Sequence, residues 1–228
     1  MIWITGDTHG EIDISKINGK NWPQGRTLSK SDYLIICGDF GLLWYDQPDR
    51  TEKWWVSWLT QKPWTTLFID GNHENYERLR NLEKIEMFGG IVGQVSDSIY
   101  HLRRGECYTI QGFTFFCFGG ARSYDMQYRT EGLNWWPEEI PSEQEKQKGL
   151  DNLAKNGDKI DYLIFHTVPR RYLKELGENI DKTVDPTIDY LESICNTVEF
   201  KHGYSGHFHI DKQFNKWTLL YNQVIKIG

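Results

Sequence analysis

Apolar runs that end in Asp, Asn or His restrict the fold of this chain more than any other feature of its sequence. Five segments end this way, at Gly6-Asp7-Thr8-His9, Gly38-Asp39, Gly71-Asn72-His73, His166 and Gly206-His207-Phe208-His209. In open α/β sheets, ligands bind outside the carboxyl ends of the strands. We therefore expect one site that is assembled from loops far apart in the sequence.

The order of the expected elements favours an α/β fold. Strands at 2–5, 33–37 and 65–69 alternate with helical stretches at 11–17, 50–62 and 75–84, which predicts a largely parallel sheet. Strands at 98–102, 107–110 and 113–118 follow, then a strand near 162, a helix at 186–196 and a final β stretch. Two sheets with helices on their outer faces would hold this set. We expect a single domain over 1–228, with a loop and helix insertion at about 119–160.

Two local patterns give sharper expectations. Trp54, Trp55 and Trp58 lie at helical spacing, so we predict that they belong to the core. Ser142 and Glu145 have the spacing of a capping box, which predicts that a helix begins there.

Composition excludes several functional classes. The 228 residues carry a net charge of -6, which argues against general nucleic-acid binding. No apolar run approaches the length of a membrane span, and the first residues lack the pattern of a secretory signal. The four cysteines form no CxxC pair, so we expect no cysteine zinc site. Reduced thiols predict a cytoplasmic protein.

The strand ends supply seven side chains of metal-binding type. They are Asp7, His9, Asp39, Asn72, His166, His207 and His209. Seven donors are too many for one tetrahedral ion, but they suit two ions if one carboxylate bridges them. Imidazole and carboxylate donors without thiolate point to Mn, Fe, Zn or Ni rather than Ca. We expect Mn first, with Mg as a further alternative.

These motifs, in this order, resemble those of the calcineurin-like metallophosphoesterases. The matching segments are GDTHG (6–10), GDFG (38–41), GNHE (71–74), His166 and GHFH (206–209). The segment "GGARSYD…WWPEEIPS" also resembles bacterial and phage members, which implies a bacterial or phage-infected cell. The resemblance implies a β-sandwich of two sheets flanked by helices (αββα).

The resemblance also implies roles for individual residues. Asp7, His9 and His209 would hold one ion, Asn72, His166 and His207 would hold the other, and Asp39 would bridge them. His73 would be the catalytic histidine. The implied activity is hydrolysis of a phosphate ester by metal-activated water. We expect a phosphodiester of a small, nucleotide-like molecule, with a phosphomonoester or a non-catalytic scaffold as alternatives.

The second motif departs from that of the protein phosphatases of this family, which read GDxVDRG. Leu42 and Leu43 stand where those enzymes have Asp and Arg. This argues against a protein Ser/Thr phosphatase and leaves the orienting partner of His73 open, with Glu74 as a neighbour in sequence. Arg122 and Arg129 are candidates for binding substrate phosphate, and surface salt bridges are the alternative.

Overall fold

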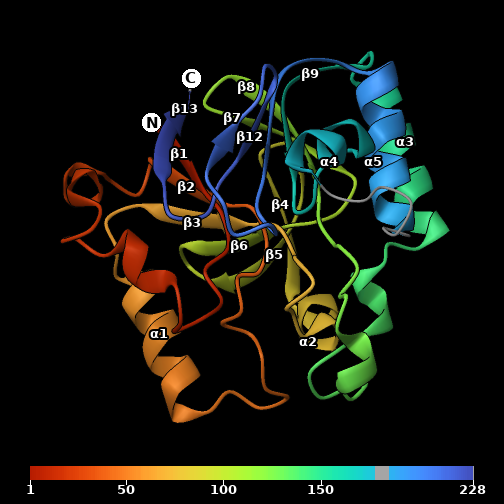
Figure 1. Ribbon diagram of the computed structural model, residues 1–228. Coiled ribbons are helices and arrows are strands. Elements are labelled where there is room, and N and C mark those ends of the chain that lie inside the picture. Colours follow the sequence, from red (N-terminus) through yellow and green to blue (C-terminus); the bar gives the residue numbers. More distant parts are fainter. Residues whose placement is uncertain (178–184, 228) are drawn as a thin grey trace.

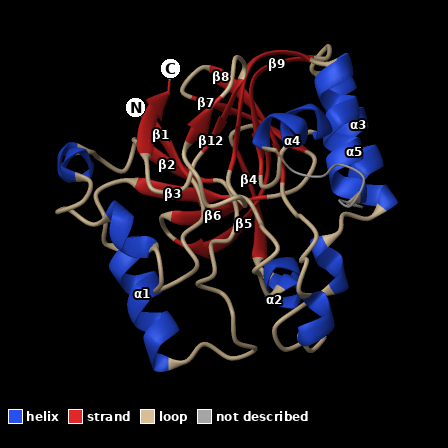
Figure 2. Cartoon of the chain, in the orientation of Figure 1, coloured by secondary structure: helices blue, strands red, loops and turns tan. Residues whose placement is uncertain are grey.

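The computed structural model describes residues 1–177 and 185–227, which form two mixed β-sheets packed face to face (Figures 1 and 2). The first sheet has the order β13 (Val224–Ile227), β1 (Ile2–Thr5), β2 (Tyr33–Ile36), β3 (Thr65–Phe68), β6 (Ile99–Leu102), β5 (Gly90–Ser96) and β4 (Glu83–Met87). The second has the order β11 (Lys212–Gln213), β12 (Trp217–Leu219), β10 (Glu199–Ser205), β9 (Lys159–Phe165), β8 (Phe113–Phe118) and β7 (Glu106–Ile110).

Parallel strands form the centre of each sheet. In the first sheet, β1, β2, β3 and β6 pair in parallel, and in the second sheet β8, β9, β10 and β12 do so. Neighbouring parallel strands end at the same edge. The loops that follow β1, β2 and β3 are therefore brought together, and so are those that follow β9 and β10.

Three apolar layers explain this arrangement. Residues such as Ile4 and Leu67 of the first sheet pack with Phe115 and Ile164 of the second to form the central layer. The helices α1 (Arg50–Thr60) and α2 (Tyr76–Asn81) contribute to a layer with the first sheet. The helices α3 (Glu143–Lys155), α4 (Arg170–Leu176) and α5 (Pro186–Thr197) contribute to a layer with the second. In Figure 1, the sheets lie between α1 and the pair α3 and α5. The predicted fold class, two sheets flanked by helices, is confirmed.

Side-chain caps fix where the longer helices begin. The Asp49 carboxylate accepts a hydrogen bond from Glu52 N at 2.7 Å at the start of α1. Ser142 and Glu145 form the predicted capping box of α3. Asp185 caps α5, whose first residue is Pro186. Each cap satisfies backbone N–H groups that would otherwise lack an intrahelical partner.

The helix predicted at 75–84 is shorter in the structure. It is α2, which spans Tyr76–Asn81, and the chain then turns into the hairpin of β4 and β5. Phe88 and Gly89 form the turn with positive φ angles of 59° and 84°. Two positive φ angles are typical of a tight hairpin turn. The prediction was wrong because the partner strand β5, rather than the local pattern, decides the conformation of 83–87. The stretch predicted as helical at 11–17 contains a short 3₁₀ helix at Ile14–Ile17.

The prediction that Trp54 belongs to the core was also wrong. Trp54 is 56% exposed, whereas Trp55 and Trp58 are partly buried against the layer that contains Leu59. At 3.6 residues per turn, Trp54 lies about 140° around the helix from Leu59. It therefore points toward solvent, and its ring packs edge-on against that of Trp55 at 4.6 Å.

None of the helices in the described ranges has the length and apolar character that crossing a bilayer requires. All four cysteines lie in those ranges and are free thiols.

Candidate active site

The structure brings all seven predicted donors together where strands of both sheets end. Asp7 and His9 follow β1, Asp39 follows β2, and Asn72 follows β3. The second sheet contributes His166 after β9, and His207 and His209 after β10. The site therefore lies across the two sheets, and neither sheet alone contains it.

Asp7, His9, Asp39 and His209 form a first group. One possible ligand atom from each lies within 4.8 Å of those from the other three. His9 Nε2 is 3.2 Å from Asp39 Oδ2, and His209 Nε2 is 3.2 Å from Asp7 Oδ2. This spacing is suitable for a single cation held between imidazoles and carboxylates.

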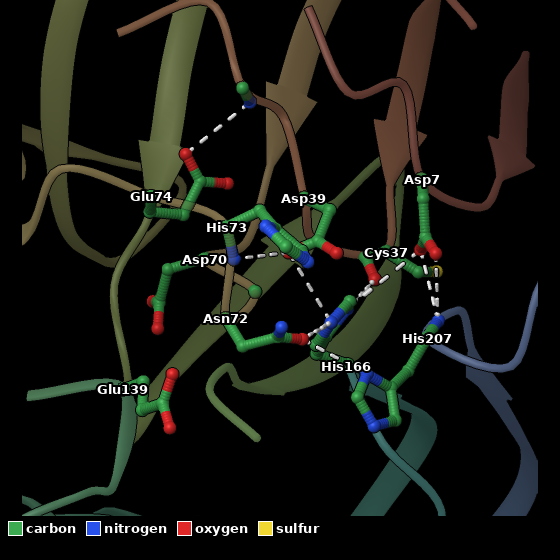
Figure 3. Close-up of polar contacts among 12 residues, drawn as sticks. Asp7, Cys37, Asp39, Asp70, Asn72, His73, Glu74, Glu139, His166 and His207 are labelled. Atoms are coloured by element: carbon green, nitrogen blue, oxygen red, sulfur yellow. Dashed lines mark hydrogen bonds and ion pairs between the residues drawn. The ribbon is translucent and has the colours of Figure 1, made fainter. Parts of the chain in front are cut away.

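Asn72, His166 and His207 form a second group on the other side of Asp39. The Oδ1 atom of Asn72 is 3.0 Å from His166 Nε2 and 3.0 Å from His207 Nδ1. Asp39 Oδ1 is 3.4 Å from His166 Nε2. The two carboxylate oxygens of Asp39 thus face different groups. Figure 3 shows Asn72, His166 and Asp39 directed toward one another.

The hydrogen bonding of His166 tests whether the second group suits a cation. His166 Nδ1 lies 2.8 Å from the carbonyl oxygen of Cys37, which can only accept, so Nδ1 carries a proton. In neutral His166, Nε2 then presents a lone pair to Asn72 Oδ1 and Asp39 Oδ1. Three acceptors that converge in a buried place need a positive charge among them, so these residues fit a divalent metal ion.

Backbone conformation also marks the site. His9, Asp39, His207 and His209 have positive φ angles of 42°, 46°, 68° and 51°. Such angles are uncommon for residues other than glycine, and strained conformations cluster at functional sites. The surrounding structure therefore holds these four residues in a geometry that their local preferences do not favour.

Two glycines beside the donors permit close approach of the carboxylates. A Cβ atom on Gly71 would lie 2.0 Å from Asp39 Oδ1, and one on Gly206 would lie 1.9 Å from Asp7 Oδ1. No side chain fits at these distances. The glycines of the GNHE and GHFH motifs are thus explained by packing against the carboxylates.

Charge in the site is balanced between carboxylates and imidazoles. Burial lowers the pKa of His9, but Asp39, Asp7 and Asp13 outweigh it and raise the pKa to about 9. Burial, and then the neighbouring His166, lower the pKa of His207 to about 3, so His207 is a neutral donor. A metal ion would compete with the proton on His9, because imidazole binds metal in its neutral form.

The comparison with protein families identifies the family of this chain. Residues 1–211 match the model of the calcineurin-like phosphoesterases. The chain belongs to the calcineurin-like phosphoesterase family. Membership implies divalent metal ions and hydrolysis of phosphate esters. The family matches the resemblance predicted from the five motifs.

Two solved structures are similar to this phosphoesterase. The phosphopantetheinyl hydrolase PptH of Mycobacterium tuberculosis is 15% identical, with a TM-score of 0.43, and the match covers 96% of this chain and 87% of that one. A protein of Staphylococcus aureus named as a 5′-nucleotidase, in complex with alpha-ketoglutarate, is 17% identical with a TM-score of 0.49. That match covers 96% of this chain and 48% of the other. No curated protein sequence matches the chain.

His73 lies beside the two groups of donors. Its backbone N–H donates to Asp39 Oδ1 at 2.7 Å, and its ring packs edge-on against that of His9 at 5.6 Å. Burial lowers the pKa of His73; the Asp39 carboxylate opposes this, and the Arg129 guanidinium adds to it. His73 thus adjoins Asp39 without being one of the converging donors.

Arg129, rather than Glu74, contacts the ring of His73. Arg129 Nη1 lies 3.1 Å from His73 Nδ1, and Arg129 Nη2 lies 3.5 Å from His73 Nε2, so the guanidinium faces both ring nitrogens. Glu74 turns away, and its carboxylate accepts from Phe40 N at 2.6 Å (Figure 3). The side chain that contacts the His73 ring is therefore that of Arg129, which lies 56 positions away in the sequence.

Arg129 and Arg122, the two arginines predicted to bind phosphate, have different contacts in the structure. Arg129 also forms a 2.8 Å ion pair with Asp125, so the predicted alternative of a salt bridge holds for it as well. The backbone N–H of Arg122 donates to the Asp185 carboxylate at 3.0 Å. Substrate binding by either arginine stays a prediction.

The contacts that orient the metal-binding candidates His9 and Asn72 were not predicted from the sequence. Asp13 Oδ2 lies 2.7 Å from His9 Nδ1, and this carboxylate four residues after His9 was a signal that could have been recognised. Asn72 Nδ2 donates to Ser123 Oγ at 3.2 Å, and Ser123 Oγ donates to the buried Glu139 at 2.6 Å. No sequence pattern links Asn72 to these two residues.

Proposed function

We propose that this chain is a dinuclear metal-dependent phosphoesterase that hydrolyses a small phosphorylated molecule. The first candidate substrate is a phosphodiester of nucleotide-like character, and a phosphomonoester is the alternative. Mn is the metal we would test first. The free thiols of the four cysteines favour a reducing compartment such as the cytoplasm.

The two oxygens of Asp39 are the observation that carries this proposal. Oδ2 lies 3.2 Å from His9 in the first group and Oδ1 lies 3.4 Å from His166 in the second. A carboxylate that faces both groups is suited to bridging two ions. Asp7, His9 and His209 would complete one ion site, and Asn72, His166 and His207 would complete the other.

Two bound divalent ions would supply a nucleophilic water at neutral pH and neutralise charge on the phosphoryl oxygens. His73 would donate a proton to the leaving oxygen. The imidazolium form of His73 would give up this proton and return to the neutral ring, which can accept a hydrogen bond from the Arg129 guanidinium. A negatively charged phosphoryl group beside His73 would favour its protonated form. The buried positions of Asp39 and His166 limit the access of bulk water to the donors.

A substrate screen tests the proposal most directly. The Mn-loaded protein would be incubated with nucleotides, cyclic nucleotides and simple aryl phosphates, as monoesters and diesters. We expect metal-dependent hydrolysis of at least one class, and EDTA should abolish it. Absence of hydrolysis across the panel, with both ions bound, would favour the alternative of a non-catalytic scaffold.

Removal of metal is expected to lower the melting temperature. The donors come from five strand ends, so the ions would bind only the folded chain. Binding to the folded state alone stabilises a protein by about 2.7 kcal/mol per site at a hundredfold excess over Kd. Calorimetry with and without EDTA measures the shift, and added Mn should restore it. An unchanged melting temperature after verified removal of metal would contradict the proposed sites.

Ser123→Ala is expected to weaken metal binding at the second group. Ser123 accepts the amide N–H of Asn72, which turns Oδ1 toward His166 and His207. Loss of such an orienting contact typically costs about 10–100-fold in metal affinity. Ser193→Ala is the matched control, because Ser193 is exposed on α5 and its hydroxyl donates to the Tyr190 carbonyl. Titration calorimetry with Mn gives both affinities, and equal values for the two variants would refute the role of Ser123.

A further inference from the structure

A cavity of about 350 Å³ opens beside the proposed catalytic residue. His9 and His73 form part of its wall, so the cavity is continuous with the site that would hold the phosphoryl group. Its volume lies within the range of about 300–1,000 Å³ that is usual for small-molecule sites. An ester bound at the donors would have room to extend past His73 into it.

Aromatic side chains form the other wall. Trp44, Tyr45 and Trp55 line the cavity together with Leu42. The Trp44 ring lies 6.3 Å from that of His73 at an angle of 32°. The ring of the buried Trp136 packs edge-on against that of Trp44 at 5.5 Å. Such rings favour a flat aromatic ligand, which can stack on them or pack edge-on.

The charged residues of the wall oppose an anion. No lysine or arginine is among the described residues that line the cavity, whereas Glu11, Asp49 and Glu52 are. Glu52 is neutralised by Arg78 at 2.7 Å, and Asp49 caps α1, but Glu11 is exposed to the cavity and to solvent. A leaving group that carried a second phosphate would be repelled here.

We propose that this cavity is the leaving-group subsite and that it takes a flat, uncharged aromatic group, such as the base of a nucleoside. The inference rests on the proposed function and makes its substrate class more specific. In the reaction, the bond from phosphorus to the leaving oxygen breaks, water supplies the new oxygen on phosphorus, and the leaving oxygen takes a proton. The product alcohol, with its aromatic group, would leave from beside His73.

Binding of the leaving group alone tests this subsite independently of turnover. Adenosine, ribose and choline would be titrated into the Mn-loaded protein by calorimetry, and each would be tested as an inhibitor of p-nitrophenyl ester hydrolysis. We expect adenosine to bind and to inhibit competitively, and ribose and choline to do neither. Choline is included because an acidic, aromatic wall can also attract a cation.

Variants locate the binding in the cavity. Tyr45→Ala and Trp55→Ala should each weaken adenosine binding by about tenfold or more, as expected when an aromatic stacking partner is lost. Trp54→Ala is the matched control, since Trp54 is on the same helix as Trp55 but is exposed and does not line the cavity. Tyr45 is 55% exposed, so its replacement tests the proposal even if Trp55→Ala does not fold.

The outcomes separate the subsite from the activity. If the enzyme hydrolyses p-nitrophenyl esters but adenosine binds no better than ribose, the subsite is wrong and the proposed function stands. Binding of choline in place of adenosine would show that charge, not the aromatic wall, selects the ligand, and would overturn the proposal. If adenosine binds in a Tyr45-dependent manner but no ester is hydrolysed, both the proposed function and the leaving-group role fail.

Discussion

Replacing His73 by alanine is expected to slow hydrolysis of alkyl or nucleoside esters by about 10²–10⁴-fold, the usual contribution of general acid catalysis. An alkoxide is a poor leaving group and needs a proton, whereas p-nitrophenolate leaves without one. The loss on p-nitrophenyl esters should therefore be clearly smaller. The ratio of kcat/KM between wild type and variant, measured on both classes of ester, gives the result.

His73→Ala should keep its metals and its fold, because the His73 side chain is not among the seven donors. Its backbone N–H, which donates to Asp39, is unchanged by the substitution. Elemental analysis and the melting temperature check both points. Equal losses on the two ester classes would indicate that His73 acts on the phosphoryl oxygens or on the water. No loss on either, with metals bound, would remove His73 from the mechanism.

Replacing Asp39 by alanine is expected to disturb both metal sites and to abolish metal-dependent hydrolysis. Asp39 is buried, and its two oxygens face His9 and His166 at 3.2 and 3.4 Å. Elemental analysis after Mn loading should give close to two ions per chain for wild type and a strongly reduced content for the variant. The Oδ1 atom of Asn72 contacts His166 and His207 of the second group, so Asn72→Ala should mainly weaken the second site.

Comparing Asp39→Ala with Asn72→Ala tests whether the Asp39 carboxylate bridges two ions. Melting of the EDTA-treated proteins would show how much each substitution affects the fold itself. A stoichiometry of one in wild type that excess metal does not change would argue against the bridge. So would an Asp39→Ala variant that retains one ion at full affinity.

Much of the candidate site could be predicted from the sequence, because its residues are tied to strand ends. Asp7, Asp39 and Asn72 each lie two or three residues after an apolar run, and parallel strands that pair side by side bring such ends to one edge. The two-sheet fold was predicted from the order of the expected strands and helices, and the resemblance to a family implied the αββα sandwich. The cap of α3 was predicted from the local spacing of Ser142 and Glu145.

The tertiary structure alone decided which side chains touch across that edge. Arg129 and His73 are 56 positions apart in the sequence, and Ser123 and Asn72 are 51 apart. No local sequence pattern could therefore predict either contact. Residues 83 and 84, which were predicted to be helical, belong to β4 because this strand pairs with β5. Trp54, which was predicted to lie in the core, is on the exposed side of α1.

The aromatic cavity is likewise a product of packing. Its walls come from the loop after β2, from α1 and from the segments that carry His9 and His73. The strand-end motifs determined which donor residues meet, because backbone pairing fixes their place. The orientation of each side chain, its hydrogen-bond partner and the space left beside it depend on neighbours distant in sequence, and only the folded chain supplies those.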